Sequence, residues 1–275
     1  MRSWWFGAAM LAVGVSAHSQ EYLSPPPEAA SPITDHLAFR AIYFLGKVTT
    51  HAQFDPSANI NNGVGTNFTA EQLLGLSEKA DQFRVELVFR LEDRNRLRVN
   101  FLDLRRAGDR ELTQQLQFGN TTFNVGEAVQ SEFDYREFDL TYTYSFLKGR
   151  WYELGAGLGV QLLEAEADAD VAATPRFAKF SGAGPFATPA LDGTIVFDRH
   201  WSLNARAQYL HIAVKSAGGL WEDYHGDLQY RWRRNLAAGL GFEYQEIGLN
   251  LNHSNPAGLV RLKLVGPEAF LRASF

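Results

Sequence analysis

From about residue 36 onward, apolar residues recur at every second position, and this alternation constrains the fold more than any other feature. In one run the apolar set is Tyr152, Leu154, Ala156, Leu158, Val160 and Leu162, and the opposite set is Glu153, Gly155, Gly157, Gly159 and Gln161. A period of two places the two sets on opposite faces of a β-strand. Strands of soluble proteins average about five or six residues, whereas these runs reach ten or more. A tilted strand needs about that length to cross a bilayer, so the pattern predicts membrane-spanning strands.

Four very short polar connections separate neighbouring runs, and aromatic or large aliphatic residues flank each of them. The flanking pairs are Phe89 and Leu97, Phe146 and Trp151, Phe197 and Trp201, and Trp232 and Leu236. Longer polar stretches lie between the other runs, at about 55–81, 107–128, 167–186, 215–223 and 251–257. Tight turns at one end, long loops at the other and aromatic residues at the strand ends are typical of a transmembrane barrel with periplasmic turns and extracellular loops.

The short connections and the longer polar stretches between the runs give the strand count. The expected strands are 36–54, 82–92, 95–106, 129–147, 150–166, 187–198, 200–214, 224–233, 235–250 and 258–275. We therefore predict an all-β fold, an antiparallel up-and-down transmembrane β-barrel over residues 36–275. Ten strands place both termini on the periplasmic side, as the even strand number of single-chain bacterial barrels requires. Eight strands is the alternative if one weak hairpin is misread.

The N-terminus has the three-part order of a secretory signal peptide. Arg2 gives a positive start, Trp4 to Val15 is an uncharged apolar run of 12 residues, and small residues follow up to Ala17. The run is too short for a membrane-spanning helix. We predict a cleaved signal peptide over 1–17 and a Pro-rich periplasmic linker over 18–35. Together with the alternation, this predicts that the protein is exported to the outer membrane.

The last predicted strand carries a resemblance to a known class of proteins. It ends in Phe275, with Leu271 and Ala273 on the same face. This resembles the C-terminal assembly signal of Gram-negative outer-membrane β-barrel proteins, and the chain is similar to small uncharacterised members of that class over residues 36–275. The resemblance implies three partners: the barrel assembly machinery, outer-membrane lipids and lipopolysaccharide. It carries no known activity.

If the apolar face of the wall meets lipid, the opposite face lines the lumen. The charged residues on that face are Arg84, Glu86, Arg90, Arg98, Glu137, Asp139, Glu153, Arg206, Asp227, Arg231, Glu243 and Arg272, which are six basic and six acidic groups. A selective pore usually has an excess of one sign at its constriction. Balanced charges in a narrow lumen favour pairing across the interior, because isolated charges away from water are costly. This predicts a closed, salt-bridged lumen, with a small diffusion pore as the alternative.

Two acidic clusters near predicted strand ends are candidates for chemistry: Asp168 with Asp170, and Asp223 with His225. Asp and His two positions apart share a strand face, where a carboxylate can orient an imidazole as a general base. This is similar to the omptins, ten-stranded outer-membrane proteases with an Asp–His pair and an Asp pair at the outer rim. Asp223 and His225 fall at the fourth outer connection, where the omptin Asp–His pair also falls. The omptin Asp pair belongs to the second connection, whereas Asp168 and Asp170 fall at the third.

The remaining features narrow the function classes. The net charge of -5 argues against a nucleic-acid partner. The chain has no Cys, and its seven His residues show no metal-ligand spacing, so we expect neither a cofactor nor a metal. The Thr69-Ala70-Glu71-Gln72 segment predicts a short helix in the first long connection. The sequence favours a non-enzymatic membrane protein with a structural role or with loops that bind an unidentified ligand; a small diffusion pore and an omptin-type rim hydrolase are the alternatives.

Overall fold

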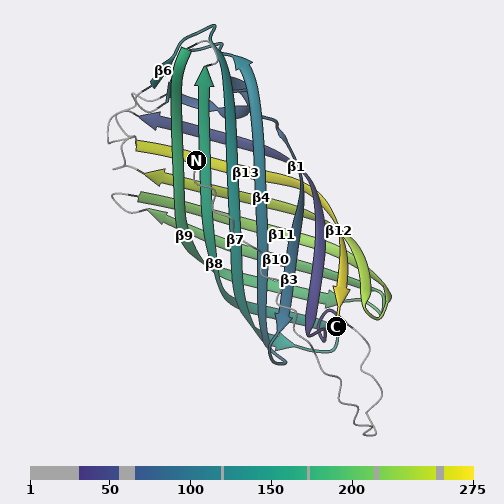
Figure 1. The fold of residues 1–275 in the computed structure, drawn as a ribbon. Coiled ribbons are helices and arrows are strands. Elements are labelled where there is room, and N and C mark those ends of the chain that lie inside the picture. Colours follow the sequence, from purple (N-terminus) through teal and green to yellow (C-terminus); the bar gives the residue numbers. More distant parts are fainter. Residues whose placement is uncertain (1–30, 56–65, 119–120, 172–173, 214–216, 252–256) are drawn as a thin grey trace, which may run out of the picture.

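A computed structural model describes residues 31–55, 66–118, 121–171, 174–213, 217–251 and 257–275. Ten of its strands form a closed antiparallel barrel (Figure 1). In wall order they are β1 (Leu37–Asp55), β3 (Lys79–Arg90), β4 (Asn95–Glu111), β7 (Ala128–Lys148), β8 (Tyr152–Val171), β9 (Thr174–Val196), β10 (Trp201–Ala213), β11 (Ala217–Arg233), β12 (Leu236–Leu251) and β13 (Ala257–Ser274). The barrel closes where β13 pairs with β1, from Ala38 opposite Ser274 to Asp55 opposite Ala257.

The connections differ sharply between the two ends of the barrel. The turn end carries the short connections 91–94, 149–151, 197–200 and 234–235. The loop end carries β2 (Thr66–Thr69) and α1 (Ala70–Leu73) in the first long connection, and the hairpin of β5 (Leu116–Phe118) and β6 (Thr121–Phe123) in the second. None of the described residues forms a helix long and apolar enough to span a bilayer.

The ten strands, their antiparallel order, the four turns and the short helix after Thr69 are as predicted. Two expected long loops were wrong. β8 continues to Val171 and β9 begins at Thr174, so the predicted loop 167–186 is mostly strand. β11 likewise begins at Ala217, inside the predicted loop 215–223.

The physical reason for this correction is an inversion of polarity along the strands, which is clearest in β7. In the half near the turn end, outward Phe138, Leu140, Tyr142 and Tyr144 are exposed, while inward Glu137, Asp139, Thr141 and Thr143 are buried. In the other half the outward residues are Gln130, Glu132, Asp134 and Arg136, and the buried inward ones are Val129, Phe133 and Tyr135. The period of two is unbroken, but at residues 135–137 the apolar face changes from outside to inside.

The same inversion occurs in β8. On its turn-end side Leu158, Val160 and Leu162 face outward. On its loop-end side the same outward face continues with Glu164, Glu166, Asp168 and Asp170. A wall that is apolar outside and polar inside suits lipid, whereas the reverse suits water. The sequence predicts a loop where these acidic residues begin, because the apolar outer face of the strand ends there.

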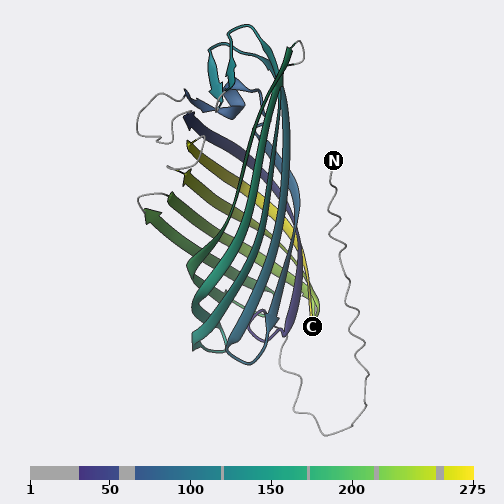
Figure 2. The same cartoon turned by 60° about the vertical axis from the view of Figure 1, so that its left-hand side comes forward.

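The barrel wall divides into two sheets at the loop end. The β3–β4 ladder ends at Val85 opposite Phe101, and the β9–β10 ladder ends at Ala190 opposite Gln208. Pro189 lies next to the second of these points and has no N–H to donate to a neighbouring strand. Beyond these two points β4, β7, β8 and β9 form one sheet and the other six barrel strands form the second, and Figure 2 shows them diverging.

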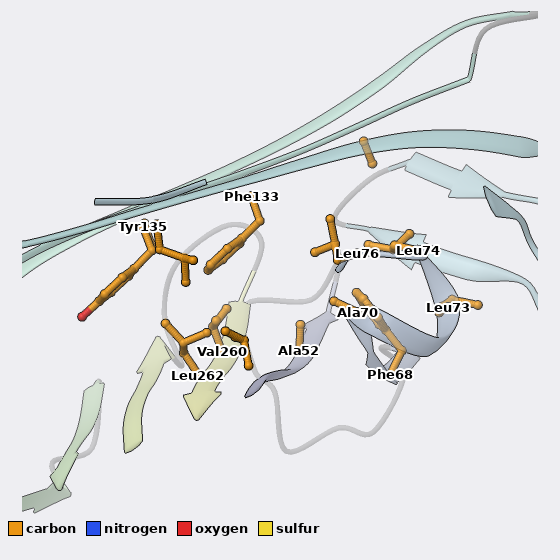
Figure 3. Packing of buried hydrophobic residues seen from close by; sticks show 14 of the residues in the cluster. Ala52, Phe68, Ala70, Leu73, Leu74, Leu76, Phe133, Tyr135, Val260 and Leu262 are labelled. Atoms are coloured by element: carbon orange, nitrogen blue, oxygen red, sulfur yellow. The ribbon is translucent and has the colours of Figure 1, made fainter. Parts of the chain in front are cut away.

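An apolar core fills the space between the two sheets at the loop end. Phe133 and Tyr135 of β7 lie across from Val260 and Leu262 of β13, and residues of the first connection lie beside them (Figure 3). The buried apolar residues of that connection are Phe68, Ala70, Leu73, Leu74 and Leu76. The hairpin of the second connection adds Leu116 and Phe123.

The first connection docks tightly on β4. Its turn places Gly75 at a φ of 70°, a conformation that side chains other than glycine rarely adopt. The facing residue is Gly108 of β4, where an added Cβ would lie 2.5 Å from the carbonyl oxygen of Leu74. Glu71 of α1 is buried and accepts hydrogen bonds from the Thr50 backbone N–H at 2.9 Å and from Arg106 at 2.6 Å. The connection therefore seals the loop end by close backbone packing and a buried ion pair.

Candidate functional site: the charged lumen

All twelve charged residues predicted to line the lumen point inward, in the half of the barrel nearer the turn end. Eleven of them are buried, and the side chain of the twelfth, Arg98, is 16% exposed. The strand period positions them, because each follows an outward residue, which is apolar except for Arg136 before Glu137 and Gly226 before Asp227.

Glu153 of β8 is the centre of one cluster. Its side chain is fully buried, and its two oxygens accept hydrogen bonds from Arg90 of β3 at 2.8 and 2.9 Å. Ser145 donates to the same carboxylate at 2.6 Å, and Arg96 lies 3.3 Å away. Arg96 also donates to Asp192 of β9 at 2.6 Å. The two-pronged contact with Arg90 joins β3 to β8, which β4 and β7 separate in the wall, by the strongest type of hydrogen bond available to these groups.

Glu86 of β3 is the centre of a second cluster. It accepts hydrogen bonds from Arg40 of β1 at 3.2 Å and from Arg206 of β10 at 3.0 Å, and Arg98 lies 3.5 Å away. Arg40 also donates to Asp227 of β11 at 3.0 Å. The cluster therefore connects five barrel strands through charged side chains.

The turn end is closed by the segment before β1. Asp35 accepts hydrogen bonds from Arg231 at 2.6 Å and from Arg272 at 3.0 Å. Ile33 of the same segment is 2% exposed. Residues 31–35, predicted as the end of a linker, thus lie against the barrel mouth, while residues 1–30 lie outside the described residues.

Two carboxylates nearer the apolar core have neutral partners. Glu137 accepts hydrogen bonds from the Tyr135 hydroxyl and the Gln245 amide, each at 2.9 Å. Asp139 accepts from Thr141 at 2.7 Å and from Gln208 at 3.4 Å. Beside them, Arg84 is paired with Glu243. This layer connects the charged clusters to the apolar core above it.

The predicted set omitted several residues of the network. Arg40, Arg96, Asp192 and Glu268 are inward and buried, and so are Asp223 and His225. The side chain of Asp35, which joins the network at the turn end, is 7% exposed. Most of them lie two positions from a predicted member or from another inward residue, so a stricter extension of the period would have found them. Asp35 gives no such signal because it precedes the first strand.

The space left inside the network is small. A cavity of about 50 Å³ lies among Asp35, Arg98, Arg206 and His225, which is large enough for a few water molecules. It is bounded on one side by the Asp35 contacts and on the other by paired side chains. This arrangement can hold the strands together and retain water; the cavity is too small for a ligand of more than a few atoms.

The structure does not bring the two candidate catalytic clusters together. Asp223 and His225 of β11 point into the lumen, whereas Asp168 and Asp170 of β8 lie on the outward face. The ladders place Asp223 beside Gln208, Gln208 beside Ala190, and Ala190 beside Gly157. Asp168 is eleven residues beyond Gly157, about 36 Å along the strand at roughly 3.3 Å per residue.

His225 is not oriented by Asp223. Its Nε2 lies 2.8 Å from Glu268 and its Nδ1 lies 3.7 Å from Asp227. Asp223 instead lies 3.4 Å from Arg206. Within the described part of the chain, no group of three or more His, Asp or Glu side chains is arranged to hold a metal ion.

The turns outside the barrel carry two perturbed carboxyl groups. Backbone N–H groups of Trp201 and His200 donate to Asp198, each at 2.7 Å, and lower the pKa of its carboxyl. A side-chain hydrogen bond from Lys148 lowers the pKa of Asp93. Both contacts hold turns that reverse the chain between neighbouring strands.

Known proteins resemble this chain in structure. No protein-family model matches its sequence, and no characterised protein matches it by sequence. The outer membrane protease OmpT of Escherichia coli is similar with a TM-score of 0.52 and 12% identity, over 88% of this chain and 98% of that chain. The attachment invasion locus protein Ail of Yersinia pestis has a TM-score of 0.38 and 10% identity, over 86% of this chain and 99% of that chain. The toluene transporter TodX of P. putida has a TM-score of 0.35 and 8% identity, over 90% of this chain and 93% of that chain.

At such low identity the likeness to OmpT concerns the fold alone. This chain therefore has the fold of the outer-membrane β-barrel proteins. The activity of OmpT does not follow from this likeness.

Proposed function

We propose that this protein is an integral outer-membrane barrel with a closed lumen, which acts by non-enzymatic binding at its extracellular face. In this proposal the turn end faces the periplasm and the loop end faces the medium. The protein reaches the membrane after removal of residues 1–17, and the barrel assembly machinery reads the last residues of β13 together with Phe275.

The observation that carries the proposal is the two-layer filling of the barrel. A salt-bridged layer occupies the half surrounded by the outward apolar belt, and an apolar core occupies the other half. Hydrated ions cross neither a narrow network of buried ion pairs nor an apolar core without large cost. Both layers argue against the pore alternative.

The hydrolase alternative has less support. A general base must reach the proton it abstracts within hydrogen-bond distance or through one water molecule. His225 is buried among Glu268, Asp227 and Arg206, and the Asp168 cluster lies on the other side of the wall.

The test is electrical and biochemical. The purified protein in planar bilayers is expected to show no steady conductance, and the folded barrel is expected to resist SDS until it is heated. N-terminal sequencing of protein recovered from outer membranes tests removal of residues 1–17. A large, stable conductance whose ion selectivity changes in Arg206→Ala would establish the pore and refute the closed lumen. Recovery only in a soluble periplasmic extract would refute the membrane placement.

A further inference from the structure

Arginine side chains predominate among the charged residues that line the small cavity of the lumen. The six arginines are Arg40, Arg90, Arg96, Arg98, Arg206 and Arg272, and they come from β1, β3, β4, β10 and β13. The four carboxylates are those of Asp35, Glu86, Asp192 and Asp227, and the His225 ring lies beside them. Three further carboxylates, those of Glu153, Asp223 and Glu268, contact some of these arginines from outside the cavity.

The acceptors around the cavity are already in use. Each carboxylate oxygen of Asp35, Glu86, Asp192 and Asp227 accepts at least one hydrogen bond from a side chain. The Asn204 side chain donates to Asp227 at 2.7 Å and accepts from Thr194 at 3.0 Å. The His225 Nε2 lies 2.8 Å from Glu268.

The donors around the cavity are not all in use. The Nε–H groups of all six arginines are buried and make no hydrogen bond within the described part of the chain. Arg98 is the extreme case, because it donates no hydrogen bond to any residue that the structure describes. Its Nε lies 3.5 Å from Glu86, and a terminal nitrogen lies 3.8 Å from Asp192.

Unpartnered donors without unpartnered acceptors favour one kind of occupant. Buried polar groups are normally hydrogen-bonded, so the cavity should contain something that accepts from these N–H groups. A water molecule accepts, but it also brings two donors, which would have to share oxygens that already accept from other side chains. An anion only accepts, and its hydrogen bonds with guanidinium groups are roughly twice as strong as those between neutral groups.

The charge of Arg98 is the one best placed to attract that anion. Glu86 is hydrogen-bonded by Arg40 and Arg206, and Asp192 is hydrogen-bonded by Arg96. Both carboxylates are therefore neutralised without Arg98. The volume of about 50 Å³ limits the occupant to an ion of one or a few atoms.

We propose that this cavity is a binding site for a monatomic anion of the halide class, such as chloride, and that Arg98 is its main ligand. The anion stabilises the folded barrel by satisfying donors that the carboxylates leave unused. It is held in a closed lumen and does not conduct. The inference requires the folded barrel but not its orientation in a membrane.

The experiment is a urea titration of the full chain, folded into lipid vesicles, at increasing sodium chloride. Sodium gluconate keeps the ionic strength constant, because gluconate is too large for the cavity. A ligand that binds only the folded state lowers the unfolding equilibrium constant by the factor 1 + [L]/Kd. Above the Kd, each ten-fold rise in chloride is therefore expected to lower that constant about ten-fold.

Two substitutions localise the effect. Arg98→Gln leaves Glu86 and Asp192 with their hydrogen-bonded arginines, so it should fold and lose the chloride dependence. The matched control, Arg84→Gln, removes a buried guanidinium that pairs with Glu243 and does not line the cavity. It should lower stability and keep the wild-type chloride dependence.

A second measurement does not depend on any variant. Crystals of the wild-type protein grown in sodium bromide should show an anomalous scattering peak in the cavity, within hydrogen-bond distance of Arg98. Unfolding that is independent of chloride in the wild type would overturn the proposal. Equal chloride dependence in wild type and Arg98→Gln would also overturn it, because the effect would then be a general effect of salt. Stabilisation by phosphate but not by chloride, or a cavity without a bromide peak, would refute the halide site.

Discussion

Replacing Glu153 by Gln should destabilise the barrel far more than it alters permeability. The substitution keeps the shape of the side chain but removes the charge that faces Arg90 and Arg96. Arg96 retains Asp192 at 2.6 Å, whereas Arg90 is left with neutral acceptors, which are the Asp93 carbonyl oxygen at 2.9 Å and the amide oxygen of the new Gln. Removing one partner of a buried pair costs about 3–5 kcal/mol, and we expect that loss in the free energy of unfolding. Urea titration of the protein folded into lipid vesicles measures it.

Two further variants separate a buried charge from a general loss of polar contacts. Asp103→Asn breaks the exposed contact with Arg105 at 3.1 Å and should leave stability nearly unchanged, since exposed pairs contribute little. Arg90→Met with Glu153→Leu removes both charges, and an apolar pair in place of a buried ion pair is often neutral or stabilising. The double variant should therefore recover most of the loss seen in Glu153→Gln. Equal effects of Glu153→Gln and Asp103→Asn, or a double variant worse than the single one, would refute the reasoning.

Three other predictions concern the two ends of the barrel. Glu71→Ala leaves Arg106 unpaired in the seal, and limited proteolysis between residues 66 and 78 should become at least ten-fold faster, because a free-energy loss of about 1.4 kcal/mol corresponds to ten-fold. Gly108→Ala should have a similar effect, because its Cβ would lie 2.5 Å from loop backbone, while Ala107→Val on the outward face should not; cleavage rates that do not distinguish the two would contradict the docking. The pKa of Asp198 is lowered from its ordinary value of 3.8, so its contribution to stability is present above that pH and is lost as pH falls through the lower folded pKa. The difference between wild type and Asp198→Ala should consequently shrink below about pH 4, and a difference that grows there would have the wrong sign.

The sequence predicted the barrel because its main determinant is local. Alternation in runs such as 152–162 assigns a face to every residue without knowledge of the partner strand, and Gly149, between Phe146 and Trp151, indicates a turn by itself. The strand number and the inward direction of the charged side chains follow from these two signals. The pairing of Arg90 with Glu153 does not, because 63 positions separate them and they meet across the lumen from strands that are not neighbours in the wall.

The halves of the strands nearest the loop end are harder to predict, because there the outward face is polar and the inward face is apolar. Leu163, Ala165, Ala169 and Val171 continue the inward face of Glu153 and Gln161 with opposite chemistry, and the outward face becomes acidic from Glu164. A search for one constant apolar face ends the strand at Leu162. A search for the period alone would have continued it to Val171, and would have placed Asp168 outside the wall and Asp223 inside it.

The inversion also explains why the lumen needs so many ion pairs. Lipid can cover the wall only where the outward residues are apolar, and period two then forces polar residues inward over the same length. Those groups are removed from bulk water, so they need ion pairs, as Glu86 has with Arg40 and Arg206, or hydrogen bonds, as Glu137 has with Tyr135. Where the outward residues become charged, as at Arg136 and Glu164, the inward positions are free to be apolar and form an ordinary core. The same alternation of side chains, with lipid outside one half of the wall and water outside the other, thus produces both layers that close the barrel.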